Sequence, residues 1–337
     1  MFSKKQVAVL LSAALWSMLA APAVAGPLQR AKERLQERRA ERQAQQEGQG
    51  RAGAGTHEFT LRHQGLERKY LVHVPRSYTG QEAVPVLLAF HGGGGSATMM
   101  ADDELYGIVG KAEALGFIAV FPNGYSRFPG GRLATHNAGH CCGDARDKQI
   151  DDVGFVRQVV QQVQRRYRTD TARVYATGMS NGGMMAHRLA CEMADTFKAI
   201  AAVAGTDNTV ACAPSRPVSV LHIHARNDTH VLFDGGAGDD AFRDESKVTQ
   251  FTSVPATIDR WVGRNQCSPV VQKVLSVPGA YCERHASCSG GSAVQLCVTE
   301  TGGHSWPGAD RVARKGKEPA SQAIDANEVM WQFFAGL

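Results

Sequence analysis

The chain has 337 residues, of which 43% are hydrophobic and 20% are charged, and its 37 basic and 32 acidic side chains give a formal net charge of +5. This composition excludes a wholly disordered or fibrous protein, because it contains enough apolar residues to form a core. The weak positive charge gives no reason to expect nucleic acid as a partner. The length suits one large α/β domain with extensions.

Residues 1–25 have the pattern of a secretory signal peptide. The basic start MFSKK precedes the apolar run VAVLLSAALWSMLAAPA, and the small residues AVA end at Ala25. The apolar run is short for a bilayer span, so we expect cleavage after Ala25 and no stable membrane insertion of the mature chain. Loss of Lys4 and Lys5 removes two positive charges and leaves +3. The expected location is extracellular or periplasmic.

The segment 26–56 is predicted to be a basic, polar tether. Arg, Glu, Gln and Ala alternate in its first part and glycines follow, with almost no apolar stripe, so the segment cannot bury much surface. We expect a solvated helix or linker. The alternative is a weak attachment to an anionic cell envelope through residues 27–55.

Residues 57–337 have the pattern of apolar and polar residues that is typical of one globular domain. Two alternating stretches, 57–63 and 67–75, predict a hairpin. Apolar runs at 84–91 and 116–124 are typical of strands buried on both faces, and residues 97–115 between them have helical spacing. Further strands are expected at 173–178, 198–205, 217–225 and 292–300, and further helices at 151–167, 181–194 and 324–337. This alternation predicts an α/β fold with a mostly parallel central sheet and helices on both faces.

Ser180 lies in the sequence Gly178-Met179-Ser180-Asn181-Gly182, which fits the pattern G-x-S-x-G. In this pattern the serine occupies a strained turn between a strand and a helix, which holds its hydroxyl above the sheet edge. The flanking residues must be small because the turn brings two backbones close together. The following helix directs its free N–H groups toward the serine and favours developing negative charge. We predict that Ser180 is a nucleophile; the alternative is a tight turn with a buried hydroxyl.

A serine nucleophile needs a base and a carboxylate that orients this base. His304 follows the expected strand 292–300, and Asp228 follows the strand 217–225, so both come at the carboxyl ends of strands. We predict His304 as the base and Asp228 as the orienting acid, in the chain order serine, acid, histidine. His230 is too near Asp228 in sequence, and His285 is expected in a cysteine-rich loop. The other candidate acids lie in glycine-rich loops and are Asp207, Asp234, Asp239 and Asp240.

The glycines that follow His91 are expected to stabilise an oxyanion. The sequence HGGGG begins directly after a strand, where glycine backbones can approach a substrate and present N–H groups. We predict a donor at Gly92 or Gly93, with the backbone N–H of Asn181 as its partner. The alternative is a plain flexible loop, and the identity of the donating glycine stays open.

Eight cysteines and three closely spaced histidines raise the question of a metal site. In an exported chain the cysteines are expected to form disulfides, and no pair has the CxxC spacing of a structural zinc site. The adjacent Cys141 and Cys142 are expected to have distant partners or to leave one thiol free. His222, His224 and His230 are predicted to have core or surface roles, with alternating histidines on opposite sides of their strand. We expect no metal and no cofactor.

Several motifs, taken in order, resemble a known family. They are HGGGG, FPNG, NAGHCCG, DDVGF, GMSNGGMMAHRLACE, an H-x-x-x-D segment and GGHSWPG. Across residues 57–337 they resemble the single-domain esterases of the α/β-hydrolase superfamily that are grouped with polyhydroxybutyrate depolymerases and with feruloyl and acetylxylan esterases of carbohydrate esterase family 1. The resemblance implies the triad Ser180, Asp228 and His304, a Cys267–Cys288 bridge, and a Cys282–Cys297 bridge across a hairpin.

Three departures from the family pattern concern the acyl and alcohol pockets and leave the chemistry intact. His136-Asn137 stands where the family often has Trp-Asn, Ala225 where glycine is usual, and Leu232-Phe233 where Pro-Tyr is common. We take His136 and Trp306 as candidate pocket residues. An ordinary packing role for Trp306 is an equal alternative.

The resemblance implies a secreted serine carboxylic-ester hydrolase that forms an acyl-enzyme on soluble esters such as feruloyl or acetyl saccharide esters. The alternative is a hydrolase of polyhydroxyalkanoate oligomers or of another polymer, including an amide-linked one. A binding protein without catalysis on the same scaffold is a third hypothesis, which fits poorly because no triad member is missing. The expected partner is a small-molecule or oligomeric ester, with no nucleic acid.

Overall fold

The computed structural model describes residues 53–239, 241, 249–311 and 318–337. The predicted signal peptide at 1–25 and the predicted tether up to residue 52 lie outside the described residues. The first strand begins at Gly55, so the folded domain includes the last residues of the predicted tether. No helix within the described ranges is long and apolar enough to cross a membrane.

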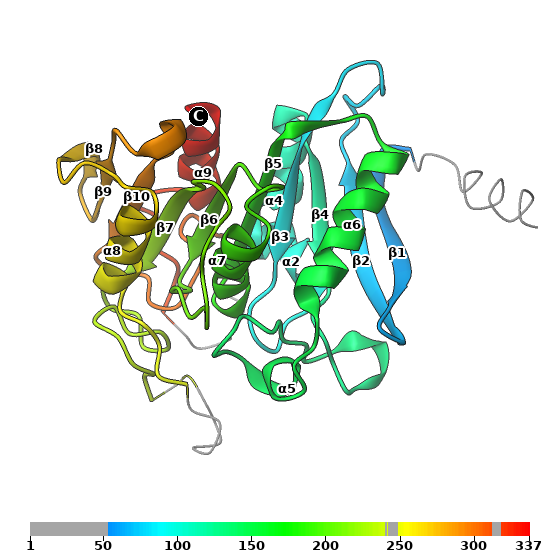
Figure 1. The fold of residues 1–337 in the computed structure, drawn as a ribbon, viewed down its shortest axis with the longest axis horizontal. Coiled ribbons are helices and arrows are strands. Elements are labelled where there is room, and N and C mark those ends of the chain that lie inside the picture. The colour runs from blue at the N-terminus through cyan, green and yellow to red at the C-terminus, as the bar shows by residue number, and fades with distance from the viewer. Residues whose placement is uncertain (1–52, 240, 242–248, 312–317) are drawn as a thin grey trace, which may run out of the picture. The chain divides into compact units, whose positions relative to one another are not determined.

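One sheet organises the described residues, in the strand order β1-β2-β4-β3-β5-β6-β7-β10-β9-β8 (Figure 1). The strands are β1 (Gly55–His63), β2 (Leu66–Val74), β3 (Val84–Phe90), β4 (Ile118–Pro122), β5 (Thr169–Met179), β6 (Ala199–Val203), β7 (Ser219–Ala225), β8 (Val271–Val277), β9 (Ala280–His285) and β10 (Val294–Thr299). The strands β4, β3, β5, β6, β7 and β10 run parallel to one another. At each end of this central set an antiparallel pair is added, β2 with β1 and β9 with β8. The predicted mostly parallel sheet is confirmed.

Helices cover both faces of this sheet, as predicted. They are α2 (Ala97–Met100), α3 (Asp103–Tyr106), α4 (Ile108–Leu115), α5 (Gly143–Asp147), α6 (Asp152–Arg166), α7 (Asn181–Glu192), α8 (Val254–Arg264) and α9 (Ala326–Ala335). Buried hydrophobic residues of α6 and α7, with Ile258 and Trp261 of α8, belong to one large core cluster, and those of α3, α4 and α9 belong to a second. Asp151 begins α6 as its N-cap, because its side chain accepts a hydrogen bond from the backbone N–H of Gly154.

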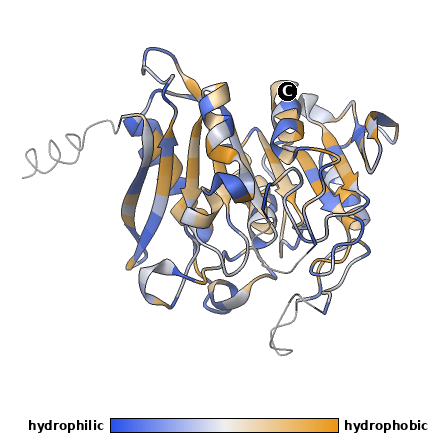
Figure 2. Cartoon of the chain, turned by 180° about the vertical axis from the view of Figure 1, so that it is seen from behind, coloured by the Kyte–Doolittle hydropathy of each residue, from blue (hydrophilic) through white to orange (hydrophobic). Residues whose placement is uncertain are grey.

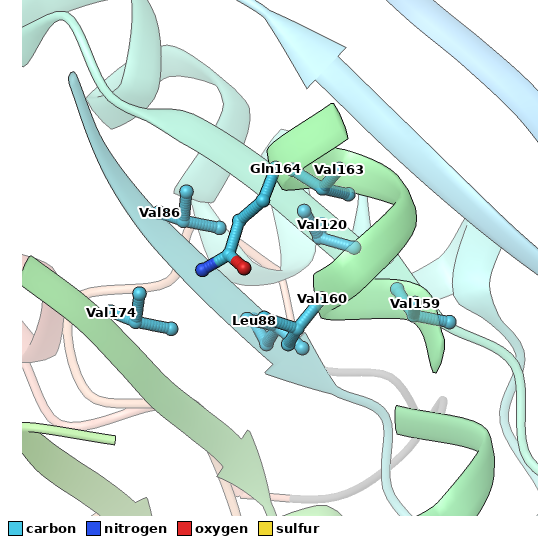
Figure 3. Close-up of a pocket in the computed structure, with 8 residues that line it drawn as sticks. All are labelled: Val86, Leu88, Val120, Val159, Val160, Val163, Gln164 and Val174. Carbon is cyan, nitrogen blue, oxygen red and sulfur yellow. The ribbon is translucent and has the colours of Figure 1, made fainter. Parts of the chain in front are cut away.

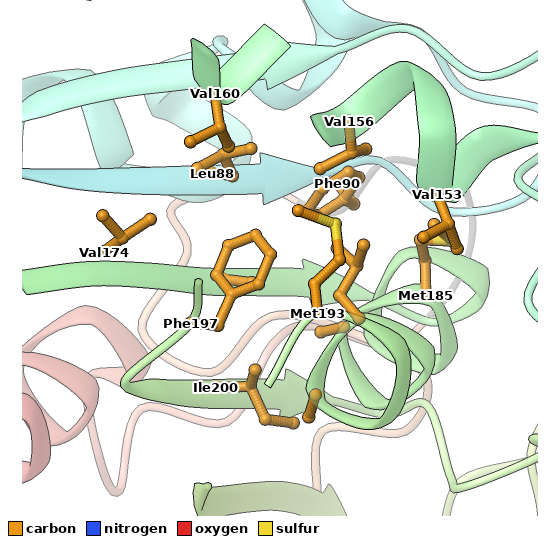
Figure 4. Packing of buried hydrophobic residues seen from close by; sticks show 14 of the residues in the cluster. Leu88, Phe90, Val153, Val156, Val160, Val174, Met185, Met193, Phe197 and Ile200 are labelled. Atoms are coloured by element: carbon orange, nitrogen blue, oxygen red, sulfur yellow. The ribbon is translucent and has the colours of Figure 1, made fainter. Parts of the chain in front are cut away.

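The two cores lie on opposite faces of the central strands. In β3, Leu88 belongs to the first core and its neighbour Leu87 to the second, because successive side chains of a strand point to opposite faces. Figure 4 shows Leu88 packed among Val160 of α6, Val174 of β5 and Phe197. The central strands are largely hydrophobic, whereas β1 and β2 at one edge mix polar and apolar residues (Figure 2). This is the pattern of strands that are buried on both faces at the centre of a sheet.

A narrow apolar gap lies between α6 and the strands β3, β4 and β5 (Figure 3). Its lining residues are Val86, Leu88, Val120, Val159, Val160, Val163, Gln164 and Val174. None of the predicted site residues borders it. The gap therefore belongs to the packing of α6 on the sheet and is not a substrate site.

Residues 97–115 differ from the prediction of one helix. They form three short helices, because Gly107 adopts a left-handed conformation (φ 62°) that ends α3 before α4 begins. The side chain of Asp102 also starts α3 afresh by accepting a hydrogen bond from Glu104 N. The sequence prediction did not include β8 and α8, and His285, expected in a loop, is the last residue of β9.

All eight cysteines are described, and they form four disulfides: Cys141–Cys142, Cys191–Cys212, Cys267–Cys288 and Cys282–Cys297. The two bridges implied by the family resemblance are confirmed, and Cys282 faces Cys297 directly in the antiparallel pair of β9 and β10. The expectation of distant partners for Cys141 and Cys142 is wrong. The other six cysteines pair among themselves, and the two adjacent residues are joined to each other across a cis peptide bond.

Candidate active site

Ser180 lies at the sharp turn between β5 and α7. Its backbone has φ 55° and ψ −121°, and a positive φ is uncommon for a residue other than glycine. Its N–H donates to the carbonyl of Val203 on the neighbouring strand (2.8 Å), and its carbonyl accepts from Met184 N in α7 (2.9 Å). The structure thus has the strand, turn and helix that the G-x-S-x-G pattern predicts around a nucleophilic serine.

Three glycines make room for this turn. A Cβ atom added to Gly178 or to Gly182 would lie less than 3.0 Å from the backbone carbonyl of Phe90. A Cβ atom on Gly205 would come equally close to the carbonyl of Ser180. The obstacles are backbone atoms, which cannot rotate away as a side chain can. Glycine is therefore required at these positions to hold Ser180 in its strained conformation.

Asp228 and His304 meet at the carboxyl edge of the sheet. They follow β7 and β10, which are adjacent parallel strands. The Nδ1 atom of His304 lies 2.8 Å from Oδ2 of Asp228. Because a carboxylate can only accept, Nδ1 carries a proton and Nε2 of a neutral His304 is left to accept another. The sequence-predicted acid and base are thus brought together in the orientation that a base and its orienting carboxylate need.

Asp228 is buried and accepts hydrogen bonds at both carboxylate oxygens. Oδ1 accepts from the backbone N–H groups of His230 (2.7 Å) and Val231 (3.0 Å). Burial alone would raise the pKa of Asp228, but the adjacent His304 and hydrogen bonds from His224 and His304 outweigh it and hold this pKa far below its ordinary value. Asp228 is therefore ionised at neutral pH.

The rival acids have other surroundings. Asp207 is buried and forms an ion pair with Arg264. Asp234 and Asp239 are exposed, and Asp240 lies outside the described residues. Among the described candidates, Asp228 is the one that contacts His304.

The third contact of the predicted triad is not among the hydrogen bonds of the described residues, which include none between the Ser180 hydroxyl and the His304 ring. In many enzymes a bond of this kind tightens only when substrate binds. The pairing of Ser180 with His304 therefore stays a prediction.

The HGGGG loop lies against the Ser180 turn. A Cβ atom on Gly92 would be 3.5 Å from Cβ of Ser180, and one on Gly93 would be 3.8 Å from Cβ of Asn181. The ring of His91 fixes this loop, because Nδ1 donates to the carbonyl of Gly92 (2.8 Å) and Nε2 accepts from Gly124 N (2.9 Å). Burial lowers the pKa of His91 to about 4, so the ring is neutral as these two bonds require. The predicted oxyanion donors are thus neighbours of Ser180, while their role stays a prediction.

The side chain of Asn181 holds the loop that contains His136. Its Oδ1 accepts from His136 N (2.7 Å), and its Nδ2 donates to the His136 carbonyl (2.9 Å). The buried ring of His136 packs against the ring of His91 at 4.4 Å, and burial lowers its pKa well below the ordinary value. His136 therefore lies beside the HGGGG loop, and its contact with substrate stays a prediction.

Trp306 is buried in the core that α9 covers. Its ring meets the ring of Tyr106 edge-on at 5.5 Å, and 3% of the residue is exposed. These contacts favour the packing role over a place at the mouth of the site.

The histidines of β7 lie on one face, contrary to the prediction. Residues two positions apart in a strand share a face, and Nε2 of His222 lies 3.0 Å from Nδ1 of His224. Both rings are buried. Among the described residues no group of three His, Cys, Asp or Glu side chains is arranged to hold a metal ion.

Comparison with known proteins identifies the family. The family model described as "Putative esterase" matches residues 63–266, which is more than half of the chain. The chain belongs to this esterase family. Feruloyl esterase B of Piromyces equi is 30% identical over 245 residues, an alignment that covers 70% of this chain and 42% of that protein. The chain thus spans less than half the length of that relative, whereas for "Probable feruloyl esterase C" of Aspergillus niger (25% identical) the match covers 81% of this chain and 85% of the relative.

The esterase also shares its fold with a solved structure. The acetyl xylan esterase from Aspergillus awamori superposes with a TM-score of 0.51 and 13% identity, covering 83% of this chain and all of that one. At this identity the likeness concerns the fold alone. The protein is a carboxylic ester hydrolase with the α/β-hydrolase fold.

The sequence analysis did not identify the side chains of this esterase that hold the site residues and their loops in place. His91 fixes the glycine loop, Asn181 holds the His136 segment, and His224 reaches Asp228 at 3.3 Å. His91 and Asn181 are parts of the quoted motifs, so their position beside the glycines and the serine was an available signal. The spacing of His222 and His224 was also informative. They are two positions apart on β7, so their side chains must lie on the same face of the sheet.

Proposed function

We propose that the protein is a secreted serine esterase that acts through an acyl-enzyme. Ser180 attacks the ester carbonyl, His304 accepts its proton at Nε2, and Asp228 orients the imidazole and stabilises its cationic form. His304 then protonates the leaving alcohol. Water repeats the sequence and releases the acid.

The hydrogen bond between His304 Nδ1 and Asp228 Oδ2 carries this proposal. It leaves Nε2 of His304 as the basic atom, which we propose accepts the proton of the Ser180 hydroxyl. The strained backbone of Ser180 and the glycine loop next to it agree with the same chemistry. The N–H of Asn181, with that of Gly92 or Gly93, is proposed to bind the oxyanion.

The proposed substrates are soluble esters of saccharides with feruloyl or acetyl groups. Support comes from the names of the sequence relatives, which include feruloyl esterases and an acetylxylan esterase. Secretion is supported by the signal-peptide pattern of residues 1–25 and by the four disulfides, because oxidising compartments favour them.

The test is hydrolysis of a substrate panel by the purified protein and by Ser180→Ala. The panel contains p-nitrophenyl acetate and butyrate, methyl ferulate, acetylated xylan and hydroxybutyrate oligomers. Ser276→Ala, an exposed serine on the edge strand β8, is the matched control and should keep full activity. We expect Ser180→Ala to lose about 10⁴-fold or more of kcat.

The ranking of substrates then decides among the hypotheses. Highest kcat/KM on methyl ferulate or acetylated xylan would support saccharide esters, whereas preference for hydroxybutyrate oligomers would favour the depolymerase alternative. Turnover that survives in Ser180→Ala would refute the serine mechanism. No turnover in either protein, with no labelling of the wild type by a fluorophosphonate probe, would favour the binding-protein hypothesis.

A further inference from the structure

Two buried histidines of β7 form a line that ends at Asp228. His222 and His224 have their rings 5.2 Å apart, and the ring nitrogens Nε2 of His222 and Nδ1 of His224 are 3.0 Å apart. Nε2 of His224 lies 2.8 Å from the Val231 carbonyl and 3.3 Å from Oδ2 of Asp228. A second imidazole, besides that of His304, therefore reaches the orienting carboxylate.

The protons on this line can be assigned from the partners. The Val231 carbonyl can only accept, so Nε2 of His224 carries a proton in either charge state of the ring. Burial holds the pKa of His222 well below its ordinary value, so His222 is neutral. When His224 is neutral as well, its Nδ1 accepts and His222 donates through Nε2. The Nε2–H of His224 then donates to the Val231 carbonyl at 2.8 Å, with Oδ2 of Asp228 as a second, longer contact at 3.3 Å.

Oδ2 of Asp228 accepts from His304 and is also contacted by Nε2 of His224, whose N–H it shares with the Val231 carbonyl. His304 approaches at 2.8 Å and His224 at 3.3 Å, while Oδ1 is held by two backbone N–H groups. The side chains of Asp228 and His224 are fully buried, and the ring of Phe233 packs edge-on against His224 at 6.0 Å. In so dry a site a hydrogen bond to a charged group is stronger than one in water. The carboxylate is consequently fixed from its buried side as well as from the side of the reaction.

We propose that His224 is a positioning residue of this esterase: its Nε2–H holds Oδ2 of Asp228 in place for His304, and His222 sets its proton and ring orientation. The inference rests on the proposed function of Ser180, Asp228 and His304. When His304 takes the proton of Ser180 it becomes cationic, and a carboxylate that cannot rotate stabilises this cation without reorganising. His224 contributes to the rate through Asp228 and does not touch the substrate.

The test compares His224→Leu, which removes the donor, with His224→Gln, whose amide N–H can replace Nε2–H. Each is also made in the Asp228→Ala background. His73→Gln is the matched control, because His73 is likewise a buried strand histidine, on β2, but it bonds Thr56 of β1 and Glu113 of α4. Kinetics with p-nitrophenyl acetate give kcat and KM separately, and thermal unfolding verifies that each variant is folded.

We expect His224→Leu to lower kcat about tenfold with KM changed less than about twofold, and His224→Gln to recover most of the loss. In the Asp228→Ala background, His224→Leu should have no further effect, because its only route to the reaction is through Asp228. A His224→Leu enzyme with wild-type kcat would overturn the proposal, as would an equal loss in both backgrounds or a loss that Gln does not restore.

A measurement that leaves His224 in place covers the case in which His224→Leu does not fold. Nitrogen-15 NMR of histidine-labelled wild type reports which ring nitrogen of His224 carries the proton. A proton at Nε2 whose resonance moves when Asp228 is replaced by Ala supports the proposal, whereas a proton on Nδ1 alone, or an Nε2–H resonance unaffected by Asp228→Ala, refutes it. Failure of the proposed function can be told apart from failure of the His224 proposal. In the first case the wild-type protein would lack esterase activity, or the Ser180→Ala variant would be active.

Discussion

The imidazole rings of His230 and His304 lie face to face, with their centroids 4.6 Å apart and their planes inclined by 9°. The backbone N–H of His230 also donates to Oδ1 of Asp228. One residue therefore supports both the base and its carboxylate, through its ring and through its backbone. A substitution at this position separates the two contributions, because it removes the ring and leaves the N–H.

The stack predicts that His230→Ala lowers kcat about three- to tenfold, whereas His230→Phe keeps most of the activity. A contact between aromatic rings contributes about 0.5–1.5 kcal/mol, and losing it lets the His304 ring leave the plane in which Nδ1 meets Asp228. The measurement is kcat and KM on p-nitrophenyl acetate, with melting temperatures as the control for folding. Equal activities of the Ala and Phe variants would show that the stack has no role in orienting His304.

Buried neutral histidines predict a loss of stability in mild acid. Burial lowers the pKa of His187 to about 4, as it does for His91, from an ordinary value of 6.5. Between these two pH values the unfolded chain binds more protons than the folded one, so the unfolding free energy falls as the pH falls from about 6.5 to about 4. Each of these histidines accounts for on the order of 3 kcal/mol across this window.

The contribution of His187 can be isolated with His187→Asn. The Asn oxygen can take over the hydrogen bond that Nδ1 accepts from Trp261 Nε1 (2.9 Å), but it does not titrate. Urea unfolding at pH 7, 6, 5 and 4 should therefore show a shallower decline for the variant than for wild type. Parallel declines would mean that His187 binds as many protons in the folded state as in the unfolded state, contrary to the lowered pKa.

Much of the fold follows from local sequence patterns, because the central strands are continuous apolar runs and the helices between them have apolar residues at helical spacing. The turn at Ser180 was predictable for the same reason, since small residues next to it are a local requirement. Asp228 and His304 could be placed at one edge because both follow strands of one parallel sheet. Local sequence could not state their separation, which depends on the adjacency of β7 and β10.

Other features depend on contacts between distant segments or on backbone geometry. The edge strand β8 exposes most of its side chains, so it has no alternating pattern to reveal it. The break at Gly107 within residues 97–115 requires a left-handed conformation, which helical spacing does not signal. The prediction that His222 and His224 lie on opposite sides of their strand was wrong. Residues two positions apart in a strand share a face, so strand geometry was enough to place both on the same side.

A buried ion pair predicts a large difference between two neighbouring residues of β2. Arg68 bonds Asp152 in the interior, and Asp152 also accepts from Asn137 N (2.7 Å) next to the His136 segment. Arg68→Leu leaves a buried carboxylate without its cation and should lower the unfolding free energy by about 3–5 kcal/mol. Lys69→Ala removes an exposed pair with Glu58 and should cost less than about 1 kcal/mol. Urea denaturation measures the unfolding free energy of both variants. Similar losses in the two variants would contradict the idea that burial makes the Arg68–Asp152 pair more important than the exposed pair.

The close packing of the glycines around Ser180 predicts that Gly182→Ala lowers stability and activity. Gly263→Ala, in α8, should not. Gly182 sits in the first turn of α7, where an added Cβ would collide with the Phe90 backbone. The strand or the turn must then shift, so we expect a loss of at least about 2 kcal/mol and a fall in activity, because Ser180 moves with its helix. Gly263 is an exposed position in α8 with nothing within 4 Å of an added Cβ.

At Gly263, alanine should instead stabilise the protein by about 0.5–1 kcal/mol, because it reduces the conformational freedom of the unfolded chain and favours the helix. Thermal unfolding and p-nitrophenyl acetate hydrolysis of both variants provide the comparison. A Gly182→Ala enzyme with wild-type activity and stability would mean that the close approach of α7 to β3 is looser than the structure shows. Such a result would also remove the steric reason for the strained backbone of Ser180, on which its exposure at the sheet edge depends.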